Sequence, residues 1–195
     1  MKLHLGCGKR FIPGFIHVDL APFPHIDYVQ DIRRLTNFKK NSASLIYACQ
    51  VLSYFDREEI PEVLKEWKRV LKPKGLLRLS VPNFEVICKL YQAGFRLDYF
   101  LGTLYGKWSM ANQTIYHKTI FDQPALTAIL AAAGFITITK WDWHKTEHAA
   151  IDDYSQAYFP HMDKEKGILF NLNIQGAKPY PTMNPVQNRG RISKL

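Results

Sequence analysis

Short apolar runs separated by polar turns recur along the first half of the chain, and they predict strands. These strands are expected at residues 2–5, 15–19, 26–29, 44–49 and 76–81. The last two runs are almost continuously apolar, which is typical of strands buried on both faces in the middle of a parallel sheet. The pattern therefore indicates an α/β protein with a largely parallel sheet.

One helix is well marked between the last two predicted strands. Asp56 and Glu59 have the spacing of a capping box, and the KPKG turn at 72–75 ends the helix. Apolar residues recur at helical spacing on one face, namely Val63, Leu64, Trp67, Val70 and Leu71. A strand, a helix and a strand in this order predict the right-handed crossover of a doubly wound sheet.

The second half of the chain predicts one more helix and two more strands. The helix is capped by Asp122 and stopped by Gly134. Strands are expected at 135–143 and 168–174, and because no strong helical pattern lies between them, we expect them to pair antiparallel. Residues 177–195 have no apolar periodicity and are expected to form an extended tail, which leaves residues 1–176 as a single domain.

Residues 84–121 are rich in aromatic side chains and follow the fifth predicted strand. This is the edge at which open α/β sheets bind their ligands. The segment is therefore expected either to cover a substrate as a lid or to pack as a subsidiary core or against another subunit. The sequence leaves both interpretations open.

The residues with the clearest chemical meaning lie at the ends of the first two strands. Residues 3–8 read LHLGCG and residues 17–20 read HVDL, so two glycines follow one strand and Asp19 ends the next. In an α/β sheet this places a close backbone turn beside a carboxylate, and a ribose can lie between them. A plain tight turn next to a strand-end acid is the competing interpretation.

Two classes of nucleotide ligand could use such a turn. A dinucleotide pyrophosphate requires GxGxxG and a helix N-terminus, but here Phe11 occupies the third glycine position and Pro13 interrupts any helix. S-adenosylmethionine carries no phosphate, and it needs a turn close to its methionine part and an acid for its ribose hydroxyls. The segment therefore favours S-adenosylmethionine over a nicotinamide dinucleotide.

Further segments follow in the order and spacing of one known family. They are IDYVQDIRRL at 26–35, SLIYACQVLSYF at 44–55 and WKRVLKPKGLLRLSVPN at 67–83. Together with the GCG turn, they make the chain resemble the class I S-adenosylmethionine-dependent methyltransferases of type 11. The resemblance implies a doubly wound, Rossmann-like, mostly parallel sheet with a C-terminal antiparallel hairpin. It also implies methyl transfer to a small molecule, saccharide or related metabolite, most readily at oxygen.

The resemblance assigns cofactor contacts to Gly6, Cys7, Gly8, Asp19, Leu20, Asp31, Ile32 and Gln50. The glycines would let the backbone pass close to the methionine part, and Asp19 would accept hydrogen bonds from both ribose hydroxyls. Asp31 would lie near the adenine amino group, although helix capping competes as its role. Gln50, at the end of the fourth strand, would approach the transferred methyl group.

The sequence also departs from the family's usual pattern. Acids that the family often has before the glycine turn and at the start of the fourth strand are here His4 and Ser44, and HVLEH is replaced by QVLSY at 50–54. These changes remove groups that could hold the cofactor or handle a proton. A catalytically silent S-adenosylmethionine-binding module with a protein-interaction role is therefore the alternative function.

An oxygen or amine acceptor needs a base, and the candidates lie in the second half of the chain. They are His117, His144 and Asp153, together with the nearby candidates His148 and Asp152. A cap or a surface position is the competing interpretation for each. The three cysteines lack CxxC spacing, and the histidines lack helical i, i+4 spacing, so no metal site is expected.

Charge and composition limit the partners. The formal net charge is +9, but no dense basic helix appears, so a nucleic acid is compatible with the charge without being the favoured partner. The chain has no membrane-length apolar run and no signal peptide, so we expect a cytoplasmic protein. Many members of the resembled family have a helix before the first strand that helps to shield the cofactor. Here we expect another element, or a second copy of the chain in a homo-oligomer, to shield it.

Overall fold

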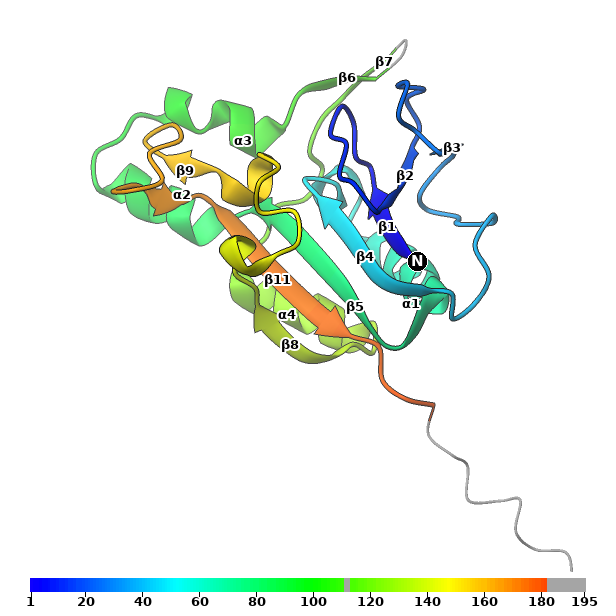
Figure 1. Cartoon of the computed structure of the whole chain (residues 1–195). Coiled ribbons are helices and arrows are strands. Elements are labelled where there is room, and N and C mark those ends of the chain that lie inside the picture. The colour runs from blue at the N-terminus through cyan, green and yellow to red at the C-terminus, as the bar shows by residue number, and fades with distance from the viewer. Residues whose placement is uncertain (111–112, 182–195) are drawn as a thin grey trace, which may run out of the picture.

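A computed structural model describes residues 1–110 and 113–181, and its centre is a seven-stranded sheet (Figure 1). The strand order is β3-β2-β1-β4-β5-β11-β8. The strands are β1 (Lys2–Leu5), β2 (Ile16–Asp19), β3 (Tyr28–Val29), β4 (Ala43–Cys49), β5 (Leu71–Pro82), β8 (Ile136–Lys140) and β11 (Asn171–Ala177). Strands β1 to β5 pair in parallel, whereas β11 pairs antiparallel with both β5 and β8. The predicted fold class is confirmed.

The remaining elements are short. The helices are α1 (Ile60–Val70), α2 (Phe84–Gln92), α3 (Leu101–Tyr105) and α4 (Gln123–Ala132). Two small hairpins pair β6 (Trp108–Met110) with β7 (Gln113–Ile115), and β9 (Tyr158–Phe159) with β10 (Ile168–Leu169). The 3₁₀ turns are η1 (Leu52–Tyr54), η2 (Leu97–Tyr99), η3 (Trp143–Lys145) and η4 (Tyr154–Gln156). Within the described ranges no helix has the length and apolar character needed to cross a membrane.

Several predicted boundaries were wrong, each for a local reason. The predicted strand 76–81 begins earlier, at Leu71, because the KPKG turn continues β5, with Lys74 in the left-handed region at φ 63°. The predicted strand 135–143 ends at Lys140, where the next residues enter η3. The predicted strand 168–174 is divided, since Ile168 and Leu169 pair with β9 while β11 continues to Ala177. The tail at 177–195 lies outside the described residues from 182 onward.

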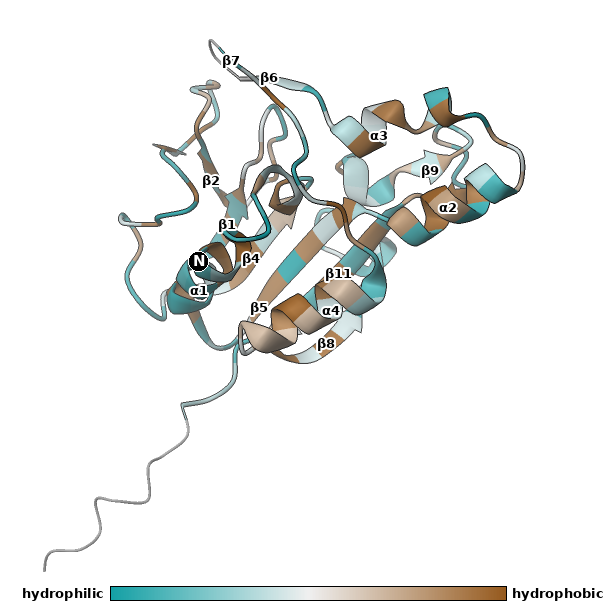
Figure 2. Ribbon diagram, turned by 180° about the vertical axis from the view of Figure 1, so that it is seen from behind, coloured by the Kyte–Doolittle hydropathy of each residue, from teal (hydrophilic) through white to brown (hydrophobic). Residues whose placement is uncertain are grey.

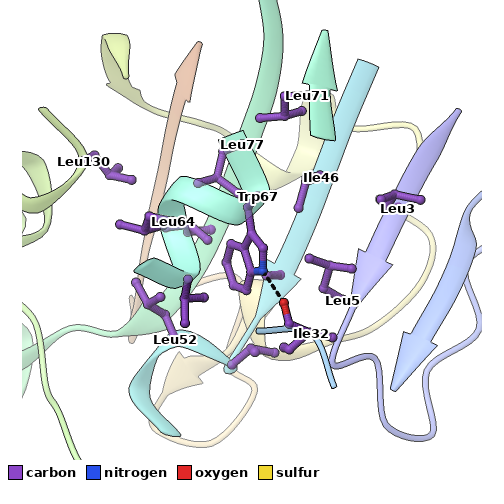
Figure 3. Close-up of a cluster of buried hydrophobic side chains, with 14 of the residues drawn as sticks. Leu3, Leu5, Ile32, Ile46, Leu52, Leu64, Trp67, Leu71, Leu77 and Leu130 are labelled. Carbon is purple, nitrogen blue, oxygen red and sulfur yellow. Dashed lines mark hydrogen bonds between the residues drawn. The ribbon is translucent and has the colours of Figure 1, made fainter. Parts of the chain in front are cut away.

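One face of the sheet is apolar and covered by helices. Figure 2 shows α1 and α4 lying against it, and the inward side chains of five strands join those of both helices in one buried cluster. Trp67 of α1 is fully buried there, and its Nε1 donates to the Ile32 carbonyl oxygen at 2.8 Å (Figure 3). This bond ties α1 to the loop after β3. The Asp122 cap of α4 is also present, since its Oδ1 accepts from the Ala125 amide at 2.8 Å.

The aromatic segment after β5 forms a third, smaller core. Phe100 is completely buried with Ile87 and Leu90 of α2 and with Phe170, which precedes β11. Several other aromatic side chains of the segment are exposed, namely Tyr91, Tyr99, Tyr105 and Tyr116. The segment therefore has a packed base, and it also presents aromatic side chains to the surface.

The other face of the sheet is polar. His17, His4, Tyr47 and Arg78 are cross-strand partners in one row over β2, β1, β4 and β5. Loops rather than helices cover this row, because Ile12, Phe15 and Trp141 come from connecting segments and pack around Tyr47 in a second buried cluster. The two faces of one sheet thus have different chemistry.

Three histidines on the polar face are buried, namely His4, His17 and His148. His4 and His148 are each 2% exposed. Burial, reinforced by the nearby His17, lowers the pKa of His4 well below its usual value. Burial also lowers the pKa of His148 against the opposing effect of Asp153. Neither ring nitrogen of His148 has a hydrogen-bond partner among the residues that the structure describes, and its ring lies 4.6 Å from that of Tyr47.

We expect the free energy of unfolding to fall as the pH drops below about 6.5, because the unfolded chain then binds protons that buried His4 and His148 do not. Each such histidine contributes a slope of at most about 1.4 kcal/mol per pH unit. His148→Phe should therefore give a shallower slope in urea unfolding between about pH 7.5 and about pH 5.5. The control His161→Gln, at an exposed histidine, should keep the wild-type slope. An unchanged slope in His148→Phe would contradict the neutral, buried state of this ring.

Candidate functional site

The candidate site lies at the carboxyl ends of the parallel strands. The Gly6–Gly8 turn follows β1, Asp19 ends β2, Asp31 lies shortly after β3, and Gln50 follows β4. Parallel strands place these ends at one edge of the sheet, which is where open α/β folds bind ligands. The structure therefore brings the predicted cofactor residues to a common edge.

Asp19 fastens the glycine turn to the second strand. Its Oδ2 accepts a hydrogen bond from the Gly8 amide at 2.8 Å, and its Oδ1 accepts one from the Ala21 amide at 2.8 Å. The Gly6 amide in turn donates to the Val18 carbonyl at 2.8 Å. Asp19 is only 7% exposed. Since a carboxylate has about four acceptor positions, this one keeps about two for a ligand's hydroxyls.

The turn requires glycine at position 6. Gly6 has φ 60°, and a Cβ there would lie 2.5 Å from Cγ2 of Val51. Val51 begins the segment after β4, so the first strand's turn and the fourth strand's exit are in close contact. Only a residue without a side chain allows this approach.

The next predicted contacts, Cys7 and Leu20, differ in exposure. Cys7 is buried, and burial together with the Asp19 carboxylate raises the pKa of its thiol to about 12. The thiol is therefore protonated at neutral pH and is not a nucleophile. Leu20 is 45% exposed and follows Asp19 directly, so its side chain is available to a ligand.

Asp31 and Ile32 already have partners in the protein. Both oxygens of Asp31 interact with Arg33, through its backbone amide at 2.8 Å and its side chain. Burial acts to raise the pKa of Asp31, but the hydrogen bonds from Arg33 outweigh it and lower the pKa. The Ile32 side chain is buried in the core, and its carbonyl oxygen accepts from Trp67.

Gln50 has an uncommon backbone conformation. Its φ is 58°, in the left-handed region, and its amide donates to the Ser80 carbonyl at 2.8 Å. A non-glycine residue held in this region stores strain, and such residues concentrate at binding sites. Gln50 is half-buried and lies between the ends of β4 and β5.

A cavity of about 590 Å³ adjoins the loop that follows Asp19. Its walls are formed by Lys9, Ala21, Pro22, Phe23, Trp108 and Ser109. The first four belong to the loops after β1 and β2, and the last two belong to β6. Its volume lies within the range of small-molecule and cofactor sites.

Of the three predicted bases, His117 lies nearest to this edge. It follows β7, its Nδ1 lies 3.0 Å from the Thr103 carbonyl oxygen, and its ring packs on Tyr54 at a centroid distance of 4.7 Å. Burial lowers the pKa of His117, although the backbone groups of Thr103 and Leu104 oppose this shift. A neutral imidazole can accept a proton at pH 7.

The other two predicted bases lie elsewhere. Asp153 is 6% exposed on the polar face, where its Oδ2 accepts from the Tyr47 hydroxyl at 2.5 Å and its Oδ1 from the Ser155 amide at 2.8 Å. His144 is an exposed residue that stacks on Trp143. Within the described part of the chain, the hydrogen bonds of Asp153 and His144 do not reach the glycine turn. Among the described residues, no three or more His, Cys, Asp or Glu side chains form a metal-binding group.

Two residues at this edge were missed in the sequence analysis. Tyr54, the last residue of QVLSY, donates its hydroxyl to the Gly106 carbonyl at 2.6 Å, and burial with a contribution from Tyr154 raises its pKa to about 12. Trp108 lies 3.6 Å from the position that a Cβ on Gly8 would occupy. The aromatic richness of the segment was the available signal for Trp108, but it does not say which aromatic residue meets the turn.

Comparison with known proteins identifies similar domains. A family model described as a methyltransferase domain matches residues 16–79. The chain is similar to the structure of an S-adenosylmethionine-dependent methyltransferase from Methanosarcina mazei, with 16% identity, a TM-score of 0.52 and 92% of each chain covered. An S-adenosylmethionine-dependent methyltransferase from Mesorhizobium loti gives 15% identity and a TM-score of 0.51, with 90% of this chain and 89% of that one covered.

A third similar structure contains ligands. It is the 1,6-didemethyltoxoflavin-N1-methyltransferase of Burkholderia thailandensis, with bound 1,6-didemethyltoxoflavin and S-adenosylhomocysteine. The identity is 16% and the TM-score 0.53, with 92% of this chain and 71% of that one covered. At these identities the likeness establishes the fold. No curated protein matches the sequence.

We expect Gly6→Ala to weaken the binding of S-adenosylhomocysteine at least about tenfold, because the new methyl group would collide with Val51 and the left-handed backbone would be strained. Titration calorimetry measures the effect. Gly102→Ala is the matched control, since a Cβ there meets nothing within 4 Å and should leave the affinity unchanged. Equal affinity in both variants would contradict the close approach of the turn to the ligand.

Proposed function

We propose that this chain is an S-adenosylmethionine-dependent methyltransferase that transfers a methyl group to an oxygen atom of a small molecule, such as a saccharide or a related metabolite. The observation that carries the proposal is the cavity of about 590 Å³ beside the Asp19 loop, which has the size of a small-molecule site. The Burkholderia neighbour, whose structure holds a small molecule with S-adenosylhomocysteine, supports the same class of acceptor.

The cofactor's ribose is assigned to Asp19. The two acceptor positions left on its carboxylate suit the two ribose hydroxyls, and the bonds from Gly8 and Ala21 fix its orientation before the ligand arrives. Gly6, Cys7 and Gly8 would let the methionine part lie against the backbone. The turn's positive φ values, 60° at Gly6 and 53° at Gly8, support this role.

The adenine is assigned to the loops after β2 and β3. Leu20 is exposed beside Asp19 and can pack on the ring. Asp31 would accept from the adenine amino group with a lone pair that Arg33 leaves free, while Ile32 would contribute backbone rather than its buried side chain. We assign Gln50, whose φ is 58° at the end of β4, to the neighbourhood of the transferred methyl group.

When bound, S-adenosylmethionine supplies an electrophilic methyl group whose carbon–sulfur bond breaks as the acceptor oxygen bonds to the methyl carbon, leaving a neutral thioether. The protein's tasks are alignment and removal of the hydroxyl proton. His117 is the base that the geometry favours, because it is neutral and lies at the carboxyl edge beside Tyr54. Tyr54, with its raised pKa, keeps its proton and donates it to the Gly106 carbonyl, so its oxygen can accept a hydrogen bond.

Asn83, at the end of β5, supports a methyl acceptor that carries hydroxyl groups. The side chain of this residue is 9% exposed, and its Oδ1 has no hydrogen-bond partner within the described part of the chain. A buried hydrogen-bond acceptor without a partner costs free energy. A ligand hydroxyl that donates to Oδ1 of Asn83 would therefore bind favourably. A saccharide offers several such donors.

We expect Asp19→Ala to abolish the heat of S-adenosylhomocysteine binding in calorimetry, because both ribose hydroxyls lose their acceptor. Asp19→Asn keeps the shape of the side chain and should still lose at least about tenfold in affinity. Asp152→Ala, at an exposed acid, is the control and should bind like the wild type. Wild-type affinity in Asp19→Asn, with an intact circular dichroism spectrum, would remove Asp19 from the site.

We expect methyl transfer from a radiolabelled donor to label small hydroxyl-bearing molecules in cell extracts. With such an acceptor, His117→Gln should lower kcat about a hundredfold through loss of the base, and it should leave S-adenosylhomocysteine affinity unchanged. His161→Gln serves as the control at an exposed histidine. Cofactor binding without any labelled product would instead favour a silent module with a protein partner, and label on protein or nucleic acid would reject the small-molecule class.

A further inference from the structure

The cofactor edge of the sheet has a wall contributed by a distant segment. Figures 1 and 2 both show β6 and β7 lying beside the loops that follow β1 and β2. In the described residues of this hairpin, Trp108 and Ser109 line the cavity of about 590 Å³, opposite the residues that follow Gly8 and Asp19. About a hundred positions along the chain therefore separate the two walls.

Trp108 lies directly over the glycine turn. Its Cζ2 is 3.6 Å from the position of a Cβ on Gly8, which is ordinary van der Waals contact. Gly8 is the residue whose amide donates to Asp19 at 2.8 Å. The indole thus lies next to the Gly8–Asp19 hydrogen bond, which orients the carboxylate assigned to the ribose. The Trp108 side chain is nevertheless only half-buried, and it also lines the cavity. The indole therefore has exposed surface that a ligand can contact.

The base of the hairpin is fixed to the end of β4, which gives Trp108 a defined position. Gly106 adopts φ 54°, and its carbonyl oxygen accepts from the Tyr54 hydroxyl at 2.6 Å. On the return strand, the His117 amide donates to the Tyr105 carbonyl at 2.7 Å. Between these two anchors, Trp108 pairs with Ile115 across the hairpin.

We propose that Trp108 is a cofactor-binding residue, whose indole covers S-adenosylmethionine where it lies against the Gly6–Gly8 turn, between the cofactor and the cavity of about 590 Å³. The inference rests on cofactor binding at the Gly6–Gly8 turn, and it is independent of which acceptor is methylated. It identifies the element that shields the cofactor as part of the same chain rather than a second copy.

The chemistry of the ligand suits an indole wall. S-adenosylmethionine presents a flat adenine, apolar methylene groups and a sulfonium cation. An indole buries a large apolar area against the adenine and the methylene groups, and its ring face attracts the sulfonium cation. Either contact is worth about tenfold or more in affinity when it is shielded from water.

The test uses S-adenosylhomocysteine with the full chain. In calorimetry, Trp108→Ala should weaken binding about tenfold or more, and Trp108→Phe should retain part of the affinity. In a fluorescence titration, the wild type should show a change in tryptophan emission on binding. Trp108→Phe should lose most of this change, whereas the control Trp143→Phe should keep it because Trp143 stacks on His144 away from the turn.

Each outcome is decisive for the inference. If the wild type binds but Trp108→Ala binds equally well, the indole is not part of the site, while the cofactor assignment stands. Tighter binding by Trp108→Ala would also overturn the inference, because the indole would then compete with the ligand for the space over the glycine turn. If the wild type itself fails to bind, the cofactor site as a whole falls. Circular dichroism of each variant shows whether the fold is intact.

Discussion

The hydrogen bond from the Gly8 amide to the Asp19 carboxylate is the contact on which the rest of the site depends. It joins the turn after β1 to the tip of β2, and the matching bond from Ala21 holds the second oxygen. The carboxylate is buried, and within the described part of the chain two backbone amides donate to it. It therefore keeps lone pairs that can accept further hydrogen bonds, at a place where water is largely excluded. Val51 enforces the same geometry from the other side, because it leaves no room for a side chain at position 6.

The parts of the molecule that local sequence determines were predicted well. Strand alternation and the glycine turn predicted the strands of the parallel sheet and the edge at which Asp19 lies, because each depends on residues close together in the chain. The Asp122 cap is another local signal that the structure confirms. The bounds of β8 and β11 were misplaced because they depend on distant partners. Residues 168–169 pair with β9, β11 pairs with β5 and β8, and Trp141 after β8 donates to the Leu79 carbonyl. The position of Trp108 over Gly8 is non-local in the same way, and no spacing rule predicts it.

The polar face of the sheet explains why the predicted bases Asp153 and His117 lie in different parts of the fold. A strand sends alternate side chains to opposite faces. On this face, Tyr47 binds Asp153 in the interior, and Asn171 and Asn173 of β11 bind backbone oxygens of η4. Asp153 therefore holds a loop on the sheet. His117, which comes from the segment after β5, lies at the carboxyl edge instead. Polar residues that look equivalent in sequence thus serve two different layers of the fold.

The β6–β7 hairpin carries Trp108 on one strand and leads into His117 after the other, and Gly106 at its base is held by Tyr54. With the roles proposed for Trp108 and His117, the cofactor side and the acceptor side of the site share one support. A displacement of this support that favours one ligand changes the free energy of the other, and thermodynamic linkage makes that influence equal in both directions. The coupling between donor and acceptor affinity would consequently depend on this hairpin and its anchors as much as on either binding surface.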